Sequence, residues 1–505
     1  MFSVKKKILI FLSFIFIPIC SIALVHSRDN GFTIYSSDST PTSSNTKINL
    51  AFEAQDHIGL SSSLWDRNLT GKGVTVAVLD TGIQPNHDTF TYDGANNWNE
   101  RIKVFYDEAI ENTTSSPYDI HWHGTWAASI LGGNSSSYTG VAPGVEFVIM
   151  QLFYDDGSEI ITSSDVLEKA VDWLIENKEI YDIKVVSMSF GVKPTADNIN
   201  ILDQLDGFVN KLVDDNILVV AAAGNDHDDP NEPTINAPAS AMSVLAVGGV
   251  DYDGEMYISS SRGPTYEGVL KPDVCAPAVS VYGAYPSPSF NDYAFASGTS
   301  ASTPFVAGLA ALMIEKDPSL TARQIKNIIS LTSYRTIFPQ TIADNIQGWG
   351  ISQGYAALEA LDKPIIMTDN IQFNINLNEN YSVFCQPITL HPNHYFFELN
   401  QLNDVSAEMY LFDSIPDRYG SPILMSHSIN GLTLSNPTKN MGAFVDVQKQ
   451  YFLVVKSLEQ KTGNFTLKLV IEYRNGILVV LAAINIVGIA YVLRKTKQTL
   501  KRSYN

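Results

Sequence analysis

Four residue types that are needed for nucleophilic attack on a carbonyl carbon occur in this chain beside apolar runs. A serine acts as nucleophile when a neutral imidazole takes its proton, a carboxylate holds that imidazole, and hydrogen-bond donors stabilise the oxyanion. Asp80 and Asn225 each follow a continuous apolar run, whereas His123 and Ser300 each precede a helix-like apolar stretch. The chain therefore contains one candidate for each role.

Each of these residues also has a structural interpretation when it is taken alone. Asp80 fits a turn cap and Asn225 fits a turn residue, because both stand next to glycine-containing turns. His123 is a lone histidine with His121 as a competitor, and lone histidines are more often structural. Ser300 fits an ordinary helix N-cap. The chemical interpretation depends on all four residues together.

The position of Ser300 favours acyl chemistry. It lies in the segment Gly298–Pro304, and an apolar helix is expected directly after that segment. Free backbone N–H groups and the helix dipole at such an N-terminus favour a developing oxyanion. Pro304 is expected in the first turn of this helix, where proline is tolerated. The side-chain amide of Asn225 is a candidate second oxyanion donor.

These residues stand in short blocks that resemble the signature sequences of subtilisin-like serine peptidases. The order Asp, His, Asn, Ser matches the subtilisin arrangement, in which the carboxylate comes first. The resemblance covers roughly residues 55–362. The matching blocks are Val78–Ile83, His123–Thr125, Gly140–Pro143, Ala222–Asn225, Ser260–Pro264, Lys271–Pro277, Gly298–Ser300 and Gly348–Gly350.

The resemblance implies a serine endopeptidase that acts on polypeptides. Ser300 would be the nucleophile and His123 the general base, with Asp80 orienting His123. Asn225 and the Ser300 amide would bind the oxyanion. By the same resemblance, one strand segment would pair with the substrate backbone by strand addition. That segment comprises Ser187, Met188, Ser189, Phe190 and Gly191.

The chain departs from the family pattern in three places. Ala301–Pro304 replaces the usual Met-Ala-x-Pro block after the serine. The acid expected nine residues after Asp80, which often binds calcium, is Thr89, although Asp88 is adjacent. Structural calcium therefore stays possible, and no metal ligand is assigned. The usual folding prodomain has no counterpart in the polar leader over residues 28–49, which is expected to be flexible.

Apolar patterning predicts the elements that must position these residues. Continuous apolar runs suit buried parallel strands, and helical periodicity over residues 164–177 separates two of them. Residues 50–362 are therefore expected to form a three-layer α/β domain around a parallel sheet. Short alternating runs over residues 370–472 predict a small antiparallel β-sandwich. The strand runs of the first domain are Val74–Leu79, Val145–Met150, Val185–Phe190 and Ile217–Ala223.

The two ends of the chain predict a membrane-tethered protein. A basic start and an apolar run make residues 1–27 a secretory signal, with an uncleaved anchor or a lipidated Cys20 as alternatives. Residues 477–493 carry no charge and precede Arg494, which predicts a single C-terminal transmembrane helix, with a buried core helix as the alternative. Residues 494–505 would be a cytoplasmic basic tail. The catalytic domain would then be extracellular.

Composition limits the remaining possibilities. The formal net charge is −20, and it is more negative still without the two basic ends, which excludes a nucleic-acid partner. With 45% hydrophobic residues the chain is not disordered throughout. Cys275 and Cys385 are expected to be buried free thiols, a bridge between them being the alternative. Two further functions remain open, a binding protein without turnover and an esterase using the same triad.

Overall fold

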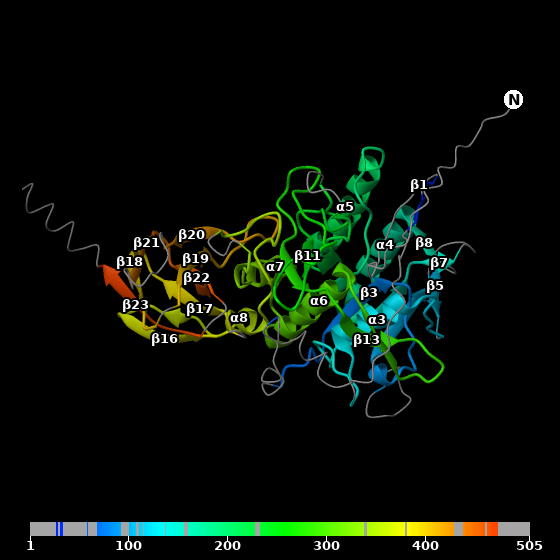
Figure 1. Cartoon of the computed structure of the whole chain (residues 1–505), viewed down its shortest axis with the longest axis horizontal. Coiled ribbons are helices and arrows are strands. Elements are labelled where there is room, and N and C mark those ends of the chain that lie inside the picture. The colour runs from blue at the N-terminus through cyan, green and yellow to red at the C-terminus, as the bar shows by residue number, and fades with distance from the viewer. Residues whose placement is uncertain are drawn as a thin grey trace, which may run out of the picture.

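The structure is a computed structural model whose two folded parts lie side by side (Figure 1). Within the described residues, no helix is both long and apolar enough to cross a bilayer. The predicted spanning segment 477–493, and all but the last residue of the predicted signal 1–27, lie outside them. The described residues are 27–28, 31–33, 58, 68–91, 100–107, 111–114, 116–136, 138–155, 160–227, 233–337, 341–378, 381–403, 405–428, 438–459 and 462–472.

An eight-stranded sheet forms the centre of the first part. Its strand order is β12-β11-β10-β9-β3-β6-β4-β5, and neighbouring strands are parallel except β4 and β5. The expectation of an all-parallel sheet is thus corrected to a mixed sheet, because Asn112–Thr114 folds back on its neighbour as an edge strand. The strands are β3 (Thr75–Asp80), β4 (Ile102–Asp107), β5 (Asn112–Thr114), β6 (Glu146–Gln151), β9 (Ile183–Met188), β10 (Leu218–Ala222), β11 (Leu245–Val250) and β12 (Val274–Pro277).

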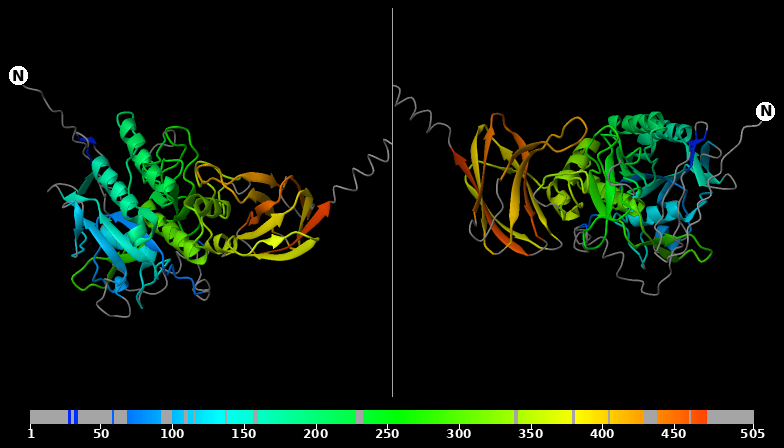
Figure 2. Two further views of the ribbon diagram at one scale, coloured as in Figure 1. Left: turned by 180° about the vertical axis from the view of Figure 1, so that it is seen from behind. Right: turned by 45° about the horizontal axis from the view of Figure 1, so that its top comes forward.

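Helices cover both faces of this sheet (Figure 2). The helices α3 and α6 pack on each other and on the sheet, and α4 and α5 form a second pair. Every residue of β3, β10 and β11 is buried, as expected for strands covered on both faces. The helices are α3 (Trp122–Gly132), α4 (Ser164–Tyr181), α5 (Ile199–Asp214), α6 (Thr299–Lys316), α7 (Ala322–Leu331) and α8 (Gly354–Glu359), with a 3₁₀ turn η1 (Asp88–Phe90).

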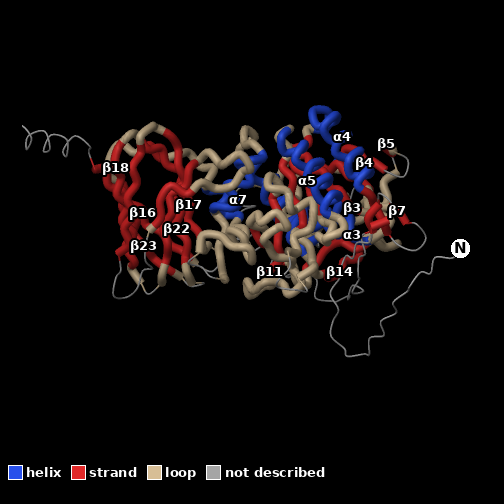
Figure 3. Tube along the Cα trace, turned by 90° about the horizontal axis from the view of Figure 1, so that it is seen from above, coloured by secondary structure: helices blue, strands red, loops and turns tan. Residues whose placement is uncertain are grey.

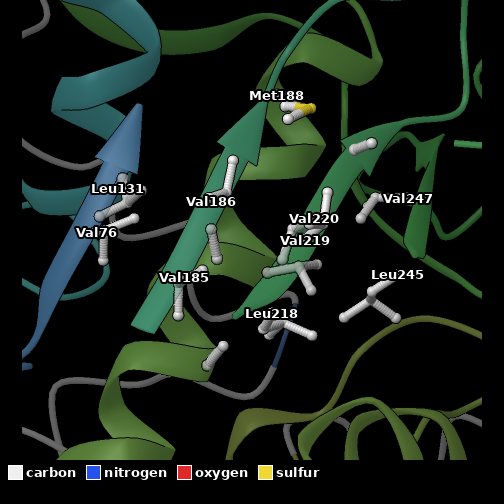
Figure 4. Close-up of a cluster of buried hydrophobic side chains, with 14 of the residues drawn as sticks. Val76, Leu131, Val185, Val186, Met188, Leu218, Val219, Val220, Leu245 and Val247 are labelled. Carbon is white, nitrogen blue, oxygen red and sulfur yellow. The ribbon is translucent and has the colours of Figure 1, made fainter. Parts of the chain in front are cut away.

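Valine-rich strands build the core of this part. By the strand register, Val185, Val220 and Val247 lie on one face of the sheet, and Val186 and Val219 lie on the other (Figure 4). β-branched residues suit this place because they pack well on a pleated surface. Helix α6 is buried over nearly its whole length, which explains why its sequence lacks a polar face. A hairpin of β13 (Val281–Tyr285) and β14 (Asp292–Ala296) precedes it.

The second part is a sandwich of two sheets, and its described residues form strands and no helix (Figure 3). The strand orders are β15-β17-β22-β19-β20 and β16-β23-β18-β21. Side chains alternate along each strand, so the two inner faces share one apolar core. The strands are β15 (Ile365–Ile366), β16 (Ile371–Leu377), β17 (Val383–Leu390), β18 (Asn393–Gln401), β19 (Ala407–Asp413), β20 (Leu424–His427), β21 (Thr438–Val445), β22 (Lys449–Ser457) and β23 (Gly463–Glu472).

The outer face of the five-stranded sheet belongs to the core of the first part. Phe412, Phe452 and Val454 from this face join the core cluster of the α/β domain. The ring of Phe412 meets the ring of Trp349 edge-on, with centroids 6.0 Å apart. The sandwich is therefore packed against the α/β domain through apolar side chains. Cys275 and Cys385 are both buried free thiols.

A further small sheet includes residues of the predicted flexible leader. Its order is β1-β2-β8-β7, and Gly31–Thr33 pairs antiparallel with residues 161–163. The leader therefore contributes a strand where its polar composition predicted none, because the backbone of β8 offers a free edge. The strands are β1 (Ser27–Arg28), β2 (Gly31–Thr33), β7 (Tyr154–Asp155) and β8 (Ile160–Ser163).

Candidate active site

Asp80 and His123 meet at the carboxyl edge of the central sheet. Asp80 is the last residue of β3 and is 2% exposed, and His123 is the second residue of α3. The Nδ1 atom of His123 lies 2.8 Å from Oδ1 and 3.0 Å from Oδ2 of Asp80. The Thr81 N–H also donates to Oδ1, at 2.7 Å. A carboxylate in this position fixes the ring orientation and the tautomer of the imidazole, leaving Nε2 for chemistry.

Two glycines allow the strand end and the helix start to approach this closely. Gly82 has a φ of +117°, and a Cβ atom there would lie 2.1 Å from the Tyr118 carbonyl oxygen. A Cβ atom on Gly124 would lie 2.2 Å from the Gly82 carbonyl oxygen. Any side chain at either position would push the two segments apart and would separate Asp80 from His123.

Ser300 lies in the first turn of α6, and its surroundings are set by Pro304. Pro304 is the sixth residue of the helix, beyond the first turn in which it was expected. Because proline has no N–H, it cannot donate the helical hydrogen bond to the Ser300 carbonyl. The hydroxyl of Ser189 donates to that carbonyl instead, at 3.1 Å. In return, the Ser300 hydroxyl donates to the Ser189 carbonyl, at 2.9 Å. The serine side chain is thus held in place until it rotates toward another acceptor.

Asn225 is fixed by its oxygen, so that its amide nitrogen is the donor end. Its Oδ1 accepts hydrogen bonds from the Thr299 N–H at 2.9 Å and the Thr299 hydroxyl at 3.2 Å. Gly298, whose φ is +152°, lies beside the amide, and a Cβ atom there would be 3.2 Å from Nδ2. The arrangement places an N–H donor next to the first turn that carries Ser300.

One cleft brings the four candidate residues together. Asp80, His123, Asn225 and Ser300 all line it, and they come from four segments that are far apart in the sequence. His121 lines the same cleft but is the N-cap of α3, whereas the bond to Asp80 is made by His123.

The predicted substrate strand divides into two portions. Ser189, Phe190 and Gly191 follow β9 and line the cleft. Ser187 and Met188 lie inside the sheet, where their backbones pair with β3 and β10 on the two sides. Only the portion after β9 is therefore placed to meet a peptide.

Apart from Phe190, the aromatic wall of the cleft was not predicted from the sequence. Trp122 and Trp126 lie on either side of His123 along α3, and their rings are 5.7 Å apart between centroids. Phe153 and Phe190 pack edge-on, with centroids 5.4 Å apart, and line the cleft with Ile160. The spacing of the two tryptophans, four residues apart on a helix that carries the histidine, is the signal that was available.

The sequence leaves structural calcium possible, and the position where the family often has a calcium-binding acid, nine residues after Asp80, is Thr89. Asp88 adjoins Thr89, and its Oδ1 already accepts the Tyr293 hydroxyl at 2.6 Å and lies 3.0 Å from Nδ1 of His87. Partial burial raises the pKa of Asp88, but the His87 and Tyr293 bonds outweigh burial and hold it below the usual value. This carboxylate is therefore satisfied by protein donors.

A protein cation already binds the backbone oxygens near this place. The buried guanidinium of Arg101 donates to the carbonyl oxygens of Gly132 at 2.5 Å and Val145 at 3.2 Å. Burial lowers the pKa of Arg101 to about 10, which leaves it charged at neutral pH. Within the described part of the chain, no cluster of three His, Cys, Asp or Glu side chains is suited to a metal. The residues present at this place do not fit a calcium ion.

Comparison with known proteins agrees with this geometry. Residues 71–350 match the Subtilase family. The chain is 34% identical to serine protease AprX of Bacillus subtilis over 52% of this chain and 62% of AprX. It is 34% identical to subtilisin DY of Bacillus licheniformis, over 52% of this chain and 84% of that protein. It is 32% identical to the minor extracellular protease Epr of Bacillus subtilis, over 53% of this chain and 37% of Epr.

The family match spans more than half of the chain and contains the four candidate residues. The chain belongs to the subtilase family and is, by class, a serine endopeptidase.

Proposed function

We propose that this protein hydrolyses peptide bonds of extracellular proteins by acyl transfer to Ser300. The observation that carries the proposal is the meeting of Asp80, His123, Asn225 and Ser300 in one cleft. His123 takes the Ser300 proton as the hydroxyl attacks the carbonyl carbon, and Asp80 stabilises the imidazolium that results. His123 then returns the proton to the leaving amine, and water hydrolyses the acyl-enzyme by the same route.

The oxyanion of each tetrahedral intermediate is bound by two donors. These are the Ser300 backbone N–H at the start of α6 and the Nδ2 amide of Asn225. The donor Asn225 is preorganised because Thr299 holds its oxygen, so no reorganisation is needed as charge develops. The backbone after β9, at Ser189–Gly191, lines the cleft and binds the substrate as an added strand.

The catalytic part faces the outside of the cell and is tethered by residues 477–493. This proposal rests on the uncharged run of 17 residues before Arg494 and on the basic, apolar start of the chain. Residues 477–493 follow shortly after β23, which ends at Glu472. The extracellular relative Epr is consistent with an outward-facing enzyme.

The test is labelling of intact cells that express the full chain with a membrane-impermeant fluorophosphonate. We expect a covalent label on Ser300, recovered in the membrane fraction, because an assembled nucleophile, base and oxyanion site is required for the reaction. The Ser300→Ala variant should take up no label. A folded wild-type chain that is not labelled even after lysis would contradict the catalytic proposal. Label that appears only after lysis, or only in the soluble fraction, would contradict the outward-facing tether.

A further inference from the structure

A second aspartate, the partly exposed Asp119, binds both segments that carry the Asp–His pair. Its Oδ1 accepts hydrogen bonds from the Thr81 hydroxyl at 2.8 Å and the His121 N–H at 3.1 Å. Its Oδ2 accepts the Thr125 N–H at 2.8 Å and the Thr125 hydroxyl at 2.5 Å. One carboxylate is therefore shared between the end of β3 and the start of α3.

Asp119 replaces the N-cap that α3 lacks. His121 occupies the N-cap position, but its side chain makes no capping hydrogen bond. The Thr125 N–H is bound by Asp119, and the Gly124 N–H is bound by the Thr81 hydroxyl at 2.9 Å. A negative charge at this end of the helix also interacts favourably with the helix dipole.

The backbone reinforces the link to β3. The Ile83 N–H donates to the Tyr118 carbonyl at 3.0 Å, and the Ile120 N–H donates to the Thr81 carbonyl at 3.2 Å. Asp119 thus lies in a short bridge that runs antiparallel to the residues after Asp80. A shift of the bridge would move the strand end and the helix start relative to each other.

We propose that Asp119 is a positioning residue for catalysis, which sets the distance between Asp80 and His123 by binding the residues that follow Asp80 and flank His123. The inference rests on the proposed function, because it assigns a role in the proton transfer at His123. It acts through Thr81 on one side and through His121 and Thr125 on the other. A displacement of about 1 Å between reacting groups is enough to lower a rate by about 100-fold.

The charge of Asp119 adds an electrostatic effect. All four of its partners donate, which suits a carboxylate that only accepts. Burial and the charge of Asp80 raise the pKa of Asp119 above its usual value, and the hydrogen bonds from Thr125 and Thr81, which favour the ionised form, only partly oppose that rise. The titratable groups around it are Asp80 at the end of β3 and His121 and His123 at the start of α3. A second negative charge near the imidazole stabilises the imidazolium of the transition state.

The experiment compares Asp119→Asn with wild type and with Asp203→Asn, an exposed aspartate on α5. For Asp119→Asn we expect kcat to fall about 10- to 100-fold with KM little changed. The acid limb of the kcat/KM profile should move to lower pH, because the imidazolium loses a nearby negative charge. Asp203→Asn should keep the wild-type rate and profile. If Asp119 served only to stabilise the fold, Asp119→Asn would lower thermal stability and leave the acid limb of the kcat/KM profile at its wild-type pH. That result would overturn the inference.

A second pair of variants covers the case in which Asp119→Asn does not fold. Thr81→Val removes the hydroxyl that joins Asp119 to Gly124, and Thr81→Ser keeps it. We expect Thr81→Val to lower kcat by about tenfold and Thr81→Ser to recover most of that loss. Equal rates for all three chains, or an equal loss in both variants, would overturn the inference.

The design separates this inference from the proposed function. If folded wild-type protein is labelled at Ser300, and folded Asp119→Asn has the wild-type kcat and pH profile, the role of Asp119 alone is refuted. If folded wild type takes no label, the proposed function itself fails, and with it the inference. Labelling and kinetics are measured in both cases on the full chain, as wild type and as the variants.

Discussion

At the residue scale, the two ends of the Asn225 side-chain amide have different roles. Its oxygen is bound twice by Thr299, the residue just before Ser300. This bond ties the donor to the turn that carries the nucleophile, so that donor and nucleophile move together. In the proposed mechanism, the amide nitrogen donates to the oxyanion, a charge that exists only during the reaction.

Asn225→Ala is expected to lower kcat by about 100- to 1,000-fold with KM little changed, because an oxyanion donor acts mainly in the transition state. Steady-state kinetics on an unstructured protein substrate measures the effect. Asn177→Ala on α4 is the matched control and should keep the wild-type kcat. A decrease of less than about threefold in folded Asn225→Ala would show that Asn225 is not the donor.

At the element scale, Arg101 joins the end of α3 to the start of β6. It lies just before β4, and its guanidinium binds Gly132 at the helix end and Val145 before the next strand. The ring of Phe147 lies 5.3 Å from the guanidinium carbon and adds a cation–π contact. A fixed side-chain cation therefore holds loops for which the family resemblance suggested a metal ion.

Arg101→Met is expected to lower the free energy of unfolding by about 3 kcal/mol, because the buried carbonyl oxygens lose their donors. Urea unfolding of the full chain measures this change. Arg101→Lys keeps a positive charge but loses the forked set of N–H donors. Its free energy of unfolding should therefore lie between those of wild type and Arg101→Met. Wild type should unfold at the same urea concentration in calcium chloride and in EDTA. A calcium-dependent midpoint that disappears in Asp88→Asn would contradict our interpretation of this loop.

At the scale of the whole molecule, the sandwich and the α/β domain share buried side chains. Lys456 of β22 is 9% exposed and donates to the Ser333 carbonyl at 2.6 Å, across the boundary between the two parts. Burial, reinforced by the charge of Arg335, lowers the pKa of Lys456 to about 7. The interface therefore contains a charge that destabilises the folded chain whenever it is protonated.

This lysine is expected to make stability depend on pH above neutrality. In the unfolded chain its pKa is about 10.4, so between about pH 7 and 10 the unfolded state binds more protons than the folded state. The wild-type free energy of unfolding, measured relative to Lys456→Met, should therefore rise with pH over that range, by at most about 1.4 kcal/mol per pH unit. Urea unfolding of both chains at several pH values measures the difference. A difference that is independent of pH would refute the assignment.

The sequence by itself determined the family, the α/β class of the first domain and the four residues of the cleft. Apolar runs of six or seven residues predict buried strands wherever they occur, and the residue after such a run lies at a sheet edge. Local pattern therefore makes Asp80 and Asn225 candidates, and the resemblance of the blocks around them to a known family selects the chemical interpretation. The positions of His123 and Ser300 followed from helix-start patterns in the same way.

Only the tertiary structure decided what holds these residues in place. No local pattern marks the roles of Asp119 and Arg101, because the partners that define those roles lie far along the chain: Thr81 for Asp119, and the carbonyls of Gly132 and Val145 for Arg101. Ser187 and Met188 belong to the same run as Ser189, and pairing with two neighbouring strands separates them from the cleft. Periodicity reports which face of one element is apolar. It does not report which strand lies beside it or which carbonyl a buried charge meets, because those contacts arise only when distant segments pack.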